Sequence, residues 1–239
     1  LKGGIMEIFV DSANLKEIEK WLRMGIADGV TTNPSIMFND GVYDMEQGAK
    51  EIANLIHPLP ISVEVTTNDL EEMLTQAQKF ASWAPNIVVK IPQVNEHGIP
   101  CYGVIRELES EGIKVNATVA LSLGQVILAA KAGATYISIF AGRVADEGGN
   151  APEVIRNSVD WLERWKYKSK IIVGSIRAVG DVLGAAMAGA HIITIPPQFL
   201  SRMADHKYTR ATVEQFVIDA NKALEMMAKV KTQDIGPRT

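Results

Sequence analysis

NIVVKIP, residues 86–92, is the stretch that decides the fold of this chain. It is a short apolar run, rich in β-branched residues, with one lysine, Lys90, near its end and Pro92 to stop it. Such a run is typical of a strand that is covered on both faces, as in parallel sheets. Burial disfavours a charged ammonium and favours the neutral, nucleophilic amine. Lys90 is therefore a candidate Schiff-base lysine, and the alternative is a lysine just past the strand end with its ammonium in water.

Short apolar runs and amphipathic segments alternate along the rest of the chain. Each apolar run is a predicted strand, and each is followed by apolar residues at helical spacing. The predicted strands span residues 6–11, 29–33, 61–66, 86–92, 114–119, 135–141, 170–176 and 191–196. The predicted helices span residues 14–24, 43–56, 70–83, 103–111, 123–132, 151–166, 181–188, 197–204 and 212–230. A glycine-rich loop is expected just before residue 151.

The number and order of these segments predict the fold. Strands that alternate with helices favour a parallel sheet with right-handed crossovers. Eight strand–helix units, without a long linker or a break in composition, predict one closed (β/α)8 barrel domain over residues 1–239, with a C-terminal helix. Residues 1–5 precede the first methionine and are expected to be extra N-terminal residues, and residues 232–239 are expected to form a flexible tail.

Composition and charge exclude several classes of function. A formal net charge of −4 gives no electrostatic attraction for nucleic acid or an anionic membrane. A single cysteine, Cys101, excludes an internal disulfide and favours a reducing compartment, so a cytoplasmic location is expected. No apolar run reaches the roughly 18 residues of a membrane helix, and no signal peptide opens the chain. The histidines lack metal-ligand spacing and Gly148-Gly149 lacks a dinucleotide-binding context, so neither a metal nor a cofactor is expected.

Polar residues cluster where the predicted strands end, and active sites of this fold gather at those ends. Taken singly, Asp11 could cap the following helix, and Asn33 could be a turn residue before Pro34. Taken together, the residues predict a polar site at one mouth of the barrel, because each would be costly to bury unpaired. They are Asp11, Thr31 to Asn33, Glu64, Lys90, Asn116, Thr118, Ser138, Arg143, Ser175 and Arg177.

Six segments of the chain resemble the signature of the class I transaldolases, and of the small subfamily that also contains the fructose-6-phosphate aldolases. They are DSANLKEI (11–18), DGVTTNPSI (28–36), VVKIP (88–92), KVNATV (114–119), AGATYISIFAGR (132–143) and SIR (175–177). The resemblance runs from Met6 to about Leu224. It implies a Schiff-base barrel enzyme that transfers a dihydroxyacetone unit from fructose 6-phosphate or sedoheptulose 7-phosphate to an aldose phosphate, as in the pentose phosphate pathway. It also implies a ring-like homo-oligomer, a pentamer or a decamer.

The resemblance further implies a role for each matching residue. Lys90 would attack the ketose carbonyl, Asp11 would exchange the proton of the hydroxyl whose carbon is released, and Glu64 would activate a bound water. Thr118 would help to hold that water. Three of the others would bond the hydroxyls of the three-carbon unit (Asn33, Asn116, Ser138) and three would clamp the phosphate (Arg143, Ser175, Arg177). The substrate-binding set is completed by Thr31 and Phe140.

Glu64 and Phe140 favour a transaldolase over an aldolase. The aldolases of the subfamily carry glutamine and tyrosine at these positions, and a tyrosine hydroxyl can help to protonate the enamine and release dihydroxyacetone. Phe140 has no hydroxyl, so the enamine should wait for an aldehyde acceptor. The alternatives are a fructose-6-phosphate aldolase that releases free dihydroxyacetone and a non-catalytic barrel that binds sugar phosphates.

The chain departs from the family pattern around the phosphate clamp. Ile139 replaces a usual proline, Ala178-Val179-Gly180 replaces a usual Asn-Pro, Ala145 replaces a common aspartate, and Leu121 stands where an aromatic residue is frequent. None of these positions is the lysine or its carboxylates. A transaldolase specialised for another anionic sugar, such as a sulfonated hexulose, is therefore a further alternative.

Overall fold

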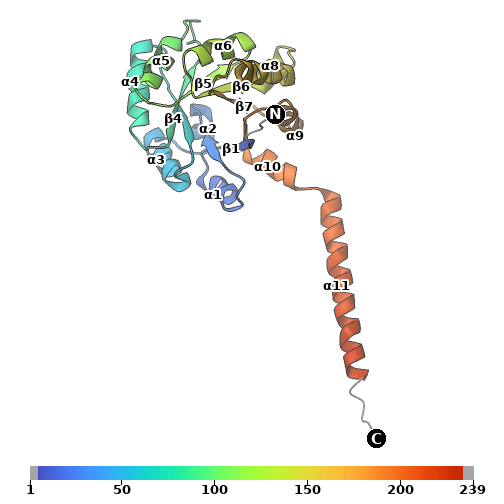
Figure 1. Ribbon diagram of the computed structural model, residues 1–239. Coiled ribbons are helices and arrows are strands. Elements are labelled where there is room, and N and C mark those ends of the chain that lie inside the picture. The colour runs from blue at the N-terminus through green and yellow to red at the C-terminus, as the bar shows by residue number, and fades with distance from the viewer. Residues whose placement is uncertain (1–4, 234–239) are drawn as a thin grey trace. The chain divides into compact units, whose positions relative to one another are not determined.

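Eight parallel strands close into a barrel in the computed structural model, which describes residues 5–233 (Figure 1). Each strand pairs with its neighbour in the sequence, and the barrel closes where β8 pairs with β1. The predicted (β/α)8 barrel with a C-terminal helix is confirmed. The strands are β1 (Glu7–Asp11), β2 (Gly29–Thr31), β3 (Ile61–Glu64), β4 (Ile87–Pro92), β5 (Val115–Ala120), β6 (Tyr136–Phe140), β7 (Lys170–Gly174) and β8 (Ile192–Ile195).

Helices follow the strands, and the helices between β1 and β8 lie on the outside of the barrel (Figure 1). They are α1 (Leu15–Arg23), α2 (Pro34–Asn39), α3 (Met45–Ile56), α4 (Leu70–Ala81), α5 (Tyr102–Ser110), α6 (Leu123–Lys131), α7 (Ala141–Asp146), α8 (Ala151–Arg164), α9 (Val179–Met187), α10 (Pro197–Ala204) and α11 (Lys207–Gln233). Polar caps set many of their starts. The side chains of Asn14, Asp44, Asp69, Ser122 and Asn150 each accept from a backbone N–H in the first turn of the helix that follows.

Two short helices differ from the sequence expectation. Helix α7 occupies residues for which the sequence pattern predicts the end of a strand and a loop, and α2 lies where the pattern predicts no helix. Each has six residues, too few for an apolar periodicity to be recognised. A local signal for α2 does exist, because Asn33 caps it and Pro34 occupies its first position.

Close contacts inside the barrel leave no room for larger side chains at some positions. Phe9, Ile172 and Ile192 form a fully buried cluster inside the barrel, and Tyr136 packs against it. A Cβ at Gly29 on β2 would lie 2.7 Å from the Phe9 ring, so glycine is required there. The strands are thus held by a packed interior below the mouth where they end.

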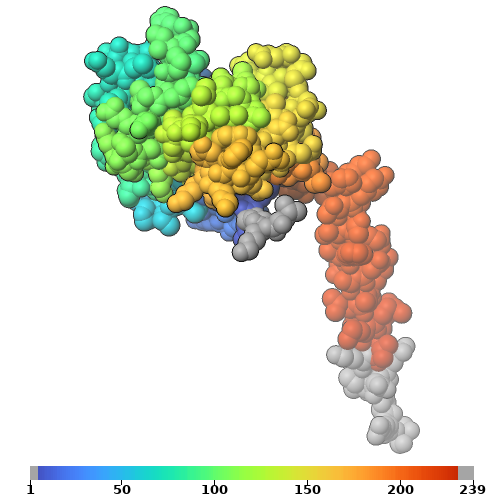
Figure 2. Space-filling view, turned by 45° about the horizontal axis from the view of Figure 1, so that its top comes forward, coloured from blue at the N-terminus to red at the C-terminus, as the bar shows by residue number. Residues whose placement is uncertain are grey.

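The contacts divide the chain into two compact units, one ending at Phe199 and the other beginning at Leu200. The barrel belongs to the first. The second unit contains α11, which is drawn in orange to red in Figure 2. Seven large apolar side chains of this helix are more than half exposed: Val213, Phe216, Val217, Leu224, Met226, Met227 and Val230. No helix among the described residues is long and apolar enough to cross a membrane. The expectations for residues 1–4 and 234–239 lie outside the described residues.

Candidate active site

Lys90 lies inside the barrel near the end of β4, and its amine is paired with Glu64. The residue is 4% exposed, so its ammonium does not reach bulk water as the alternative interpretation required. Lys90 Nζ lies 2.8 Å from Glu64 Oε2 and donates to the Thr32 carbonyl oxygen at 2.9 Å. The pairing is built by the sheet, because Glu64 and Lys90 are register partners on β3 and β4. A buried lysine whose carboxylate partner can take its proton is suited to covalent chemistry.

Asp11 ends β1 and is bonded to β2. Its Oδ1 accepts a hydrogen bond from Thr31 Oγ1 at 2.6 Å. Asp11 does not cap α1, since Asn14 performs that function, so the capping interpretation of Asp11 is wrong. Burial raises the pKa of the Asp11 carboxyl above its ordinary value, although the hydrogen bond from Thr31 and the positive charge of Lys90 both lower it. A carboxyl with a raised pKa, close to a lysine, is suited to proton exchange.

Asn116 links two other strands across the same mouth. It is a register partner of Lys90 and is fully buried. Its Oδ1 accepts from Ser138 Oγ at 2.7 Å, and its Nδ2 donates to Ser62 Oγ at 3.3 Å. The structure thus joins Asn116 and Ser138, two predicted site residues, to Ser62, which is not among the predicted ones.

Thr118 carries a buried hydroxyl whose oxygen has no hydrogen-bond partner in the described part of the chain. It lies on β5 next to an irregularity in the pairing with β6, where Val119 has a φ of 59°. A buried hydroxyl without a partner is costly unless a water or a ligand group bonds it. A water or a ligand group bonded to the Thr118 hydroxyl would remove that cost.

The two predicted clamp arginines meet on a shared carboxylate. Arg143 lies on α7 and Arg177 follows β7, and Asp146 contacts both. Asp146 binds the Arg177 guanidinium through both carboxylate oxygens and lies 3.5 Å from Arg143 Nη1. These hydrogen bonds and charges hold the pKa of Asp146 below its ordinary value and that of Arg177 above its own. Two arginines after adjacent strands form an arrangement typical of anion sites, and here the Asp146 carboxylate contacts both of them.

Ser175 and Gly142 make a close backbone contact beside the predicted clamp arginines. Ser175 has a φ of 59°, and its carbonyl oxygen accepts from Gly142 N at 3.1 Å. A Cβ at Gly142 would lie 2.4 Å from the Ser175 carbonyl oxygen and 2.8 Å from both Ser175 Oγ and Arg177 Nε. The backbone of α7 therefore approaches the β7 end closely only because residue 142 is glycine.

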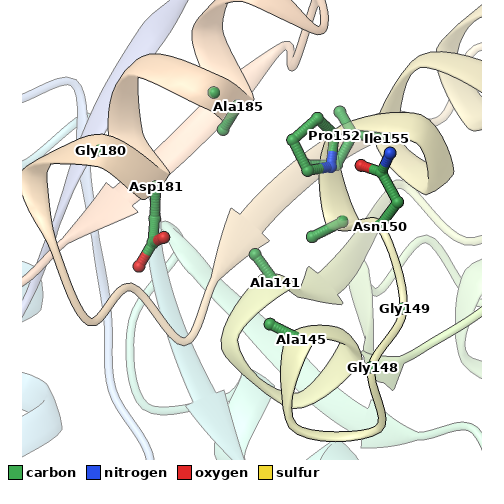
Figure 3. A pocket seen from close by; sticks show the side chains of 12 residues that line it. Ala141, Ala145, Gly148, Gly149, Asn150, Pro152, Ile155, Gly180, Asp181 and Ala185 are labelled. Atoms are coloured by element: carbon green, nitrogen blue, oxygen red, sulfur yellow. The ribbon is translucent and has the colours of Figure 1, made fainter.

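A cavity of about 380 Å³ lies between α7, α8 and α9 (Figure 3), and Arg143, Asp146, Ser175 and Arg177 are not among the residues that line it. It lies between the α7–α8 connection and the start of α9, and most of its lining residues are alanine or glycine. Asp181 lines it, and Asp181 Oδ2 accepts from the backbone N–H groups of Arg177 and Ala178. The volume is in the range of small-molecule sites, and Asp181 links this cavity to the backbone of Arg177.

Two other predicted substrate-binding residues are Asn33, which caps a helix, and Phe140, which has no polar group. Asn33 Oδ1 accepts from Ile36 N at 2.8 Å, so this atom caps α2 and the amide nitrogen is left for substrate. Phe140 ends β6, two residues beyond Ser138, so the two side chains share one face of the strand. Among residues 5–233, no group of His, Cys, Asp and Glu side chains could hold a metal ion.

The model of the transaldolase/fructose-6-phosphate aldolase family matches residues 8–236 of this chain. The chain belongs to this family. Relatives named "probable transaldolase" include one from Lactiplantibacillus plantarum, 41% identical over 90% of this chain and 96% of the relative. One from Clostridium botulinum is 41% identical over 91% of this chain and 98% of the relative. One from Dehalococcoides mccartyi is 37% identical over 90% and 97%. The resemblance to the transaldolase family in the sequence motifs is confirmed.

Four residues that are not among the predicted ones contact the candidate site in this structure. They are Ser62, Gly142, Asp146 and Thr194. Thr194 contacts Thr31 and lies in the apolar run HIITIP, where the alternation with Ile192 places it on the inward face of β8. That alternation is a usable signal. The need for Gly142 arises from contacts with residues far along the chain, and the sequence carries no sign of it.

Proposed function

We propose that this protein is a transaldolase that moves a dihydroxyacetone unit between sugar phosphates through a Schiff base on Lys90. The observation that carries the proposal is the pairing of the buried Lys90 with the partly exposed Glu64, together with a carboxyl with a raised pKa, Asp11. Family membership and the names of the relatives support the reaction type.

In the proposed first half-reaction, Glu64 accepts a proton from Lys90, and the free amine attacks the ketose carbonyl. Loss of water then gives the imine. Thr118 and Glu64 are proposed to bind the water that leaves in this step. Asp11 then removes the proton of the substrate hydroxyl as the adjacent carbon–carbon bond breaks. The aldehyde leaves, and the bonding electrons remain as an enamine on Lys90.

In the second half-reaction the enamine attacks an acceptor aldehyde, and Asp11 returns its proton to the new hydroxyl. Water then hydrolyses the imine and frees Lys90. Asn116, Ser138 and the Asn33 amide nitrogen are proposed to bond the hydroxyls of the three-carbon unit. Because hydrogen-bonding groups on several strands hold one fragment, the enamine is kept in place between the two half-reactions.

Arg143, Ser175 and Arg177 are proposed to bind the anionic end of the sugar. The internal Asp146 carboxylate reduces the positive charge of the clamp, and the departures from the family pattern also surround it. These observations favour keeping a sulfonated hexulose as a second candidate for the donor. Fructose 6-phosphate and sedoheptulose 7-phosphate remain the first.

Phe140 favours transfer over release of free dihydroxyacetone, since no hydroxyl at this position can protonate the enamine. The test is the release of dihydroxyacetone from fructose 6-phosphate with and without erythrose 4-phosphate. Transfer to the added aldehyde, with little free dihydroxyacetone in its absence, is the expected result. Rapid release that is indifferent to the acceptor would replace transaldolase by aldolase.

We also propose that the protein acts as a homo-oligomer in the cytoplasm, within the pentose phosphate pathway. The exposed apolar side chains of α11 support self-association, because such a surface is unfavourable in water. The ring-like pentamer or decamer comes from the resemblance alone, and light scattering of the full chain tests it. The single cysteine supports a reducing compartment.

A further inference from the structure

A chain of three oxygen atoms lies inside the barrel at the end of β1. Thr31 Oγ1 lies 2.6 Å from Asp11 Oδ1 and 2.5 Å from Thr194 Oγ1. The residues belong to β1, β2 and β8, and β1 pairs with both of the other strands. Thr31 is 3% exposed and Thr194 is 5% exposed, so bulk water does not compete for the contact between them, whereas the bond to Asp11 is partly buried. The result is a buried network that ends on the proposed acid/base.

The chemistry of the groups sets the direction of these hydrogen bonds. An ionised carboxylate can only accept, so Thr31 donates its one hydroxyl proton to Asp11. The Thr31 oxygen then has only acceptor capacity left, and Thr194 must donate to it. While Asp11 is ionised, both hydroxyl protons therefore point toward the carboxylate.

We infer that Thr194 is a positioning residue for the reaction, since its hydroxyl commits the Thr31 proton to Asp11 Oδ1 and leaves Asp11 Oδ2 to exchange protons with the substrate. The inference rests on the proposed function of Asp11. Within residues 5–233, Oδ1 is the only carboxylate oxygen of Asp11 with a hydrogen bond. Oδ2 takes the hydroxyl proton as the carbon–carbon bond breaks and its electron pair passes to the enamine. The reverse transfer follows when the acceptor adds.

Gly174 on β7 provides the space in which Thr194 sits. A Cβ built at Gly174 lies 3.2 Å from Thr194 Cγ2, closer than ordinary van der Waals contact. Gly174→Ala should therefore press on the Thr194 methyl group and turn the hydroxyl away from Thr31. This gives a second way to disturb the network while all three of its polar side chains remain.

The network acts on Asp11 together with three charged groups. Lys90 on β4 lowers the pKa of Asp11, whereas Glu64 on β3 and Asp40 at the end of α2 raise it, as burial does. A hydrogen bond to the charged form lowers the pKa of an acid. If Thr194 no longer orients Thr31, the pKa of Asp11 should rise further. The acid limb of the pH–rate profile then moves to higher pH.

The test is the pH dependence of kcat/KM for dihydroxyacetone transfer by Thr194→Val, which removes the hydroxyl and keeps the shape. We expect the acid limb to move upward by roughly 0.5–1 pH unit, while KM for the phosphorylated acceptor stays the same. Thr194→Ser should restore the limb. Ser169→Ala is the matched control, since Ser169 Oγ donates to the Ala134 carbonyl oxygen in another buried bond at 2.6 Å, next to the start of β7. It should lower stability without moving the limb.

A direct titration separates this inference from the proposed function. The carboxyl carbon resonance of Asp11, followed by NMR against pH, should titrate at higher pH in Thr194→Val than in the wild type. If the wild type shows no transfer, the proposed function fails, and the titration still decides the role of Thr194. An unchanged titration in Thr194→Val, or in Gly174→Ala if the valine variant does not fold, would overturn the inference. Failure of the serine variant to restore the wild-type limb would do the same.

Discussion

Gly142→Ala should disable the anion clamp while leaving the lysine chemistry intact. A new Cβ would lie 2.4 Å from the Ser175 carbonyl oxygen, whereas ordinary contacts begin at 3.4 Å. The backbone at one of the two positions must therefore shift by about 1 Å, and Arg177 Nε, 2.8 Å from the same Cβ, must move as well. A hydrogen bond lengthened by about 1 Å is effectively lost.

Loss of one charge-assisted bond costs about 1.5–3 kcal/mol, which corresponds to a roughly ten- to hundredfold rise in KM for fructose 6-phosphate. Unphosphorylated dihydroxyacetone makes no use of the clamp, so its trapping on Lys90 by borohydride should be unaffected. Gly103→Ala is the matched control, since a Cβ at this exposed position on α5 meets nothing within 4 Å. Steady-state kinetics on both variants measure the effect. Equal losses with phosphorylated and unphosphorylated substrates, or no change for Gly142→Ala, would refute the close-approach argument.

Three other substitutions test separate parts of the site. Asp146→Asn should lower the inhibition constant of inorganic phosphate by about two- to fivefold, because it removes an exposed ion pair that competes with the anion. A higher constant would show that Asp146 instead holds Arg177 in place. Phe140→Tyr should raise the release of free dihydroxyacetone without an acceptor, and an unchanged release would remove the hydroxyl argument. Asp11→Asn should raise Tm at neutral pH. The pKa of Asp11 in the folded protein lies above its ordinary value of 3.8, so the wild type loses stability as pH rises from 3.8 through the folded pKa. Thermal unfolding at several pH values checks this, and a gain that persists below pH 3.8 would contradict it.

The barrel could be predicted because its signals are local and repeated. Each strand is a short apolar run, each long helix has a helical period, and their alternation admits few topologies. Helices α2 and α7 escaped prediction since six residues are too few to show a period. The apolar pattern predicts that β7 ends at residue 176, whereas the strand ends at Gly174. Ser175 adopts a positive φ, for which the sequence has no signal.

The candidate site was predictable as a set of residues but not as a set of contacts. Motifs at strand ends indicated Lys90 and Glu64, yet their direct pairing depends on the register of β3 and β4. The contact of Asp146 with Arg177 joins residues 31 positions apart, and the requirement for Gly142 arises from the loop after β7. Such long-range contacts follow from the folded geometry and have no local sequence signal.

Covalent trapping tests the central claim, a Schiff base on Lys90, most directly. Borohydride added with fructose 6-phosphate should reduce the imine and add one dihydroxyacetone-derived unit to the protein, located at Lys90 by peptide mass spectrometry. Lys90→Ala should remain folded by circular dichroism and take up no label. Lys170→Ala is the control and should be labelled like the wild type, because Lys170 pairs with Glu7 at the other end of the strands. Label at Lys90 that requires the sugar is the predicted result. Label at another lysine, or a wild type that binds the sugar and takes up none, would contradict the account.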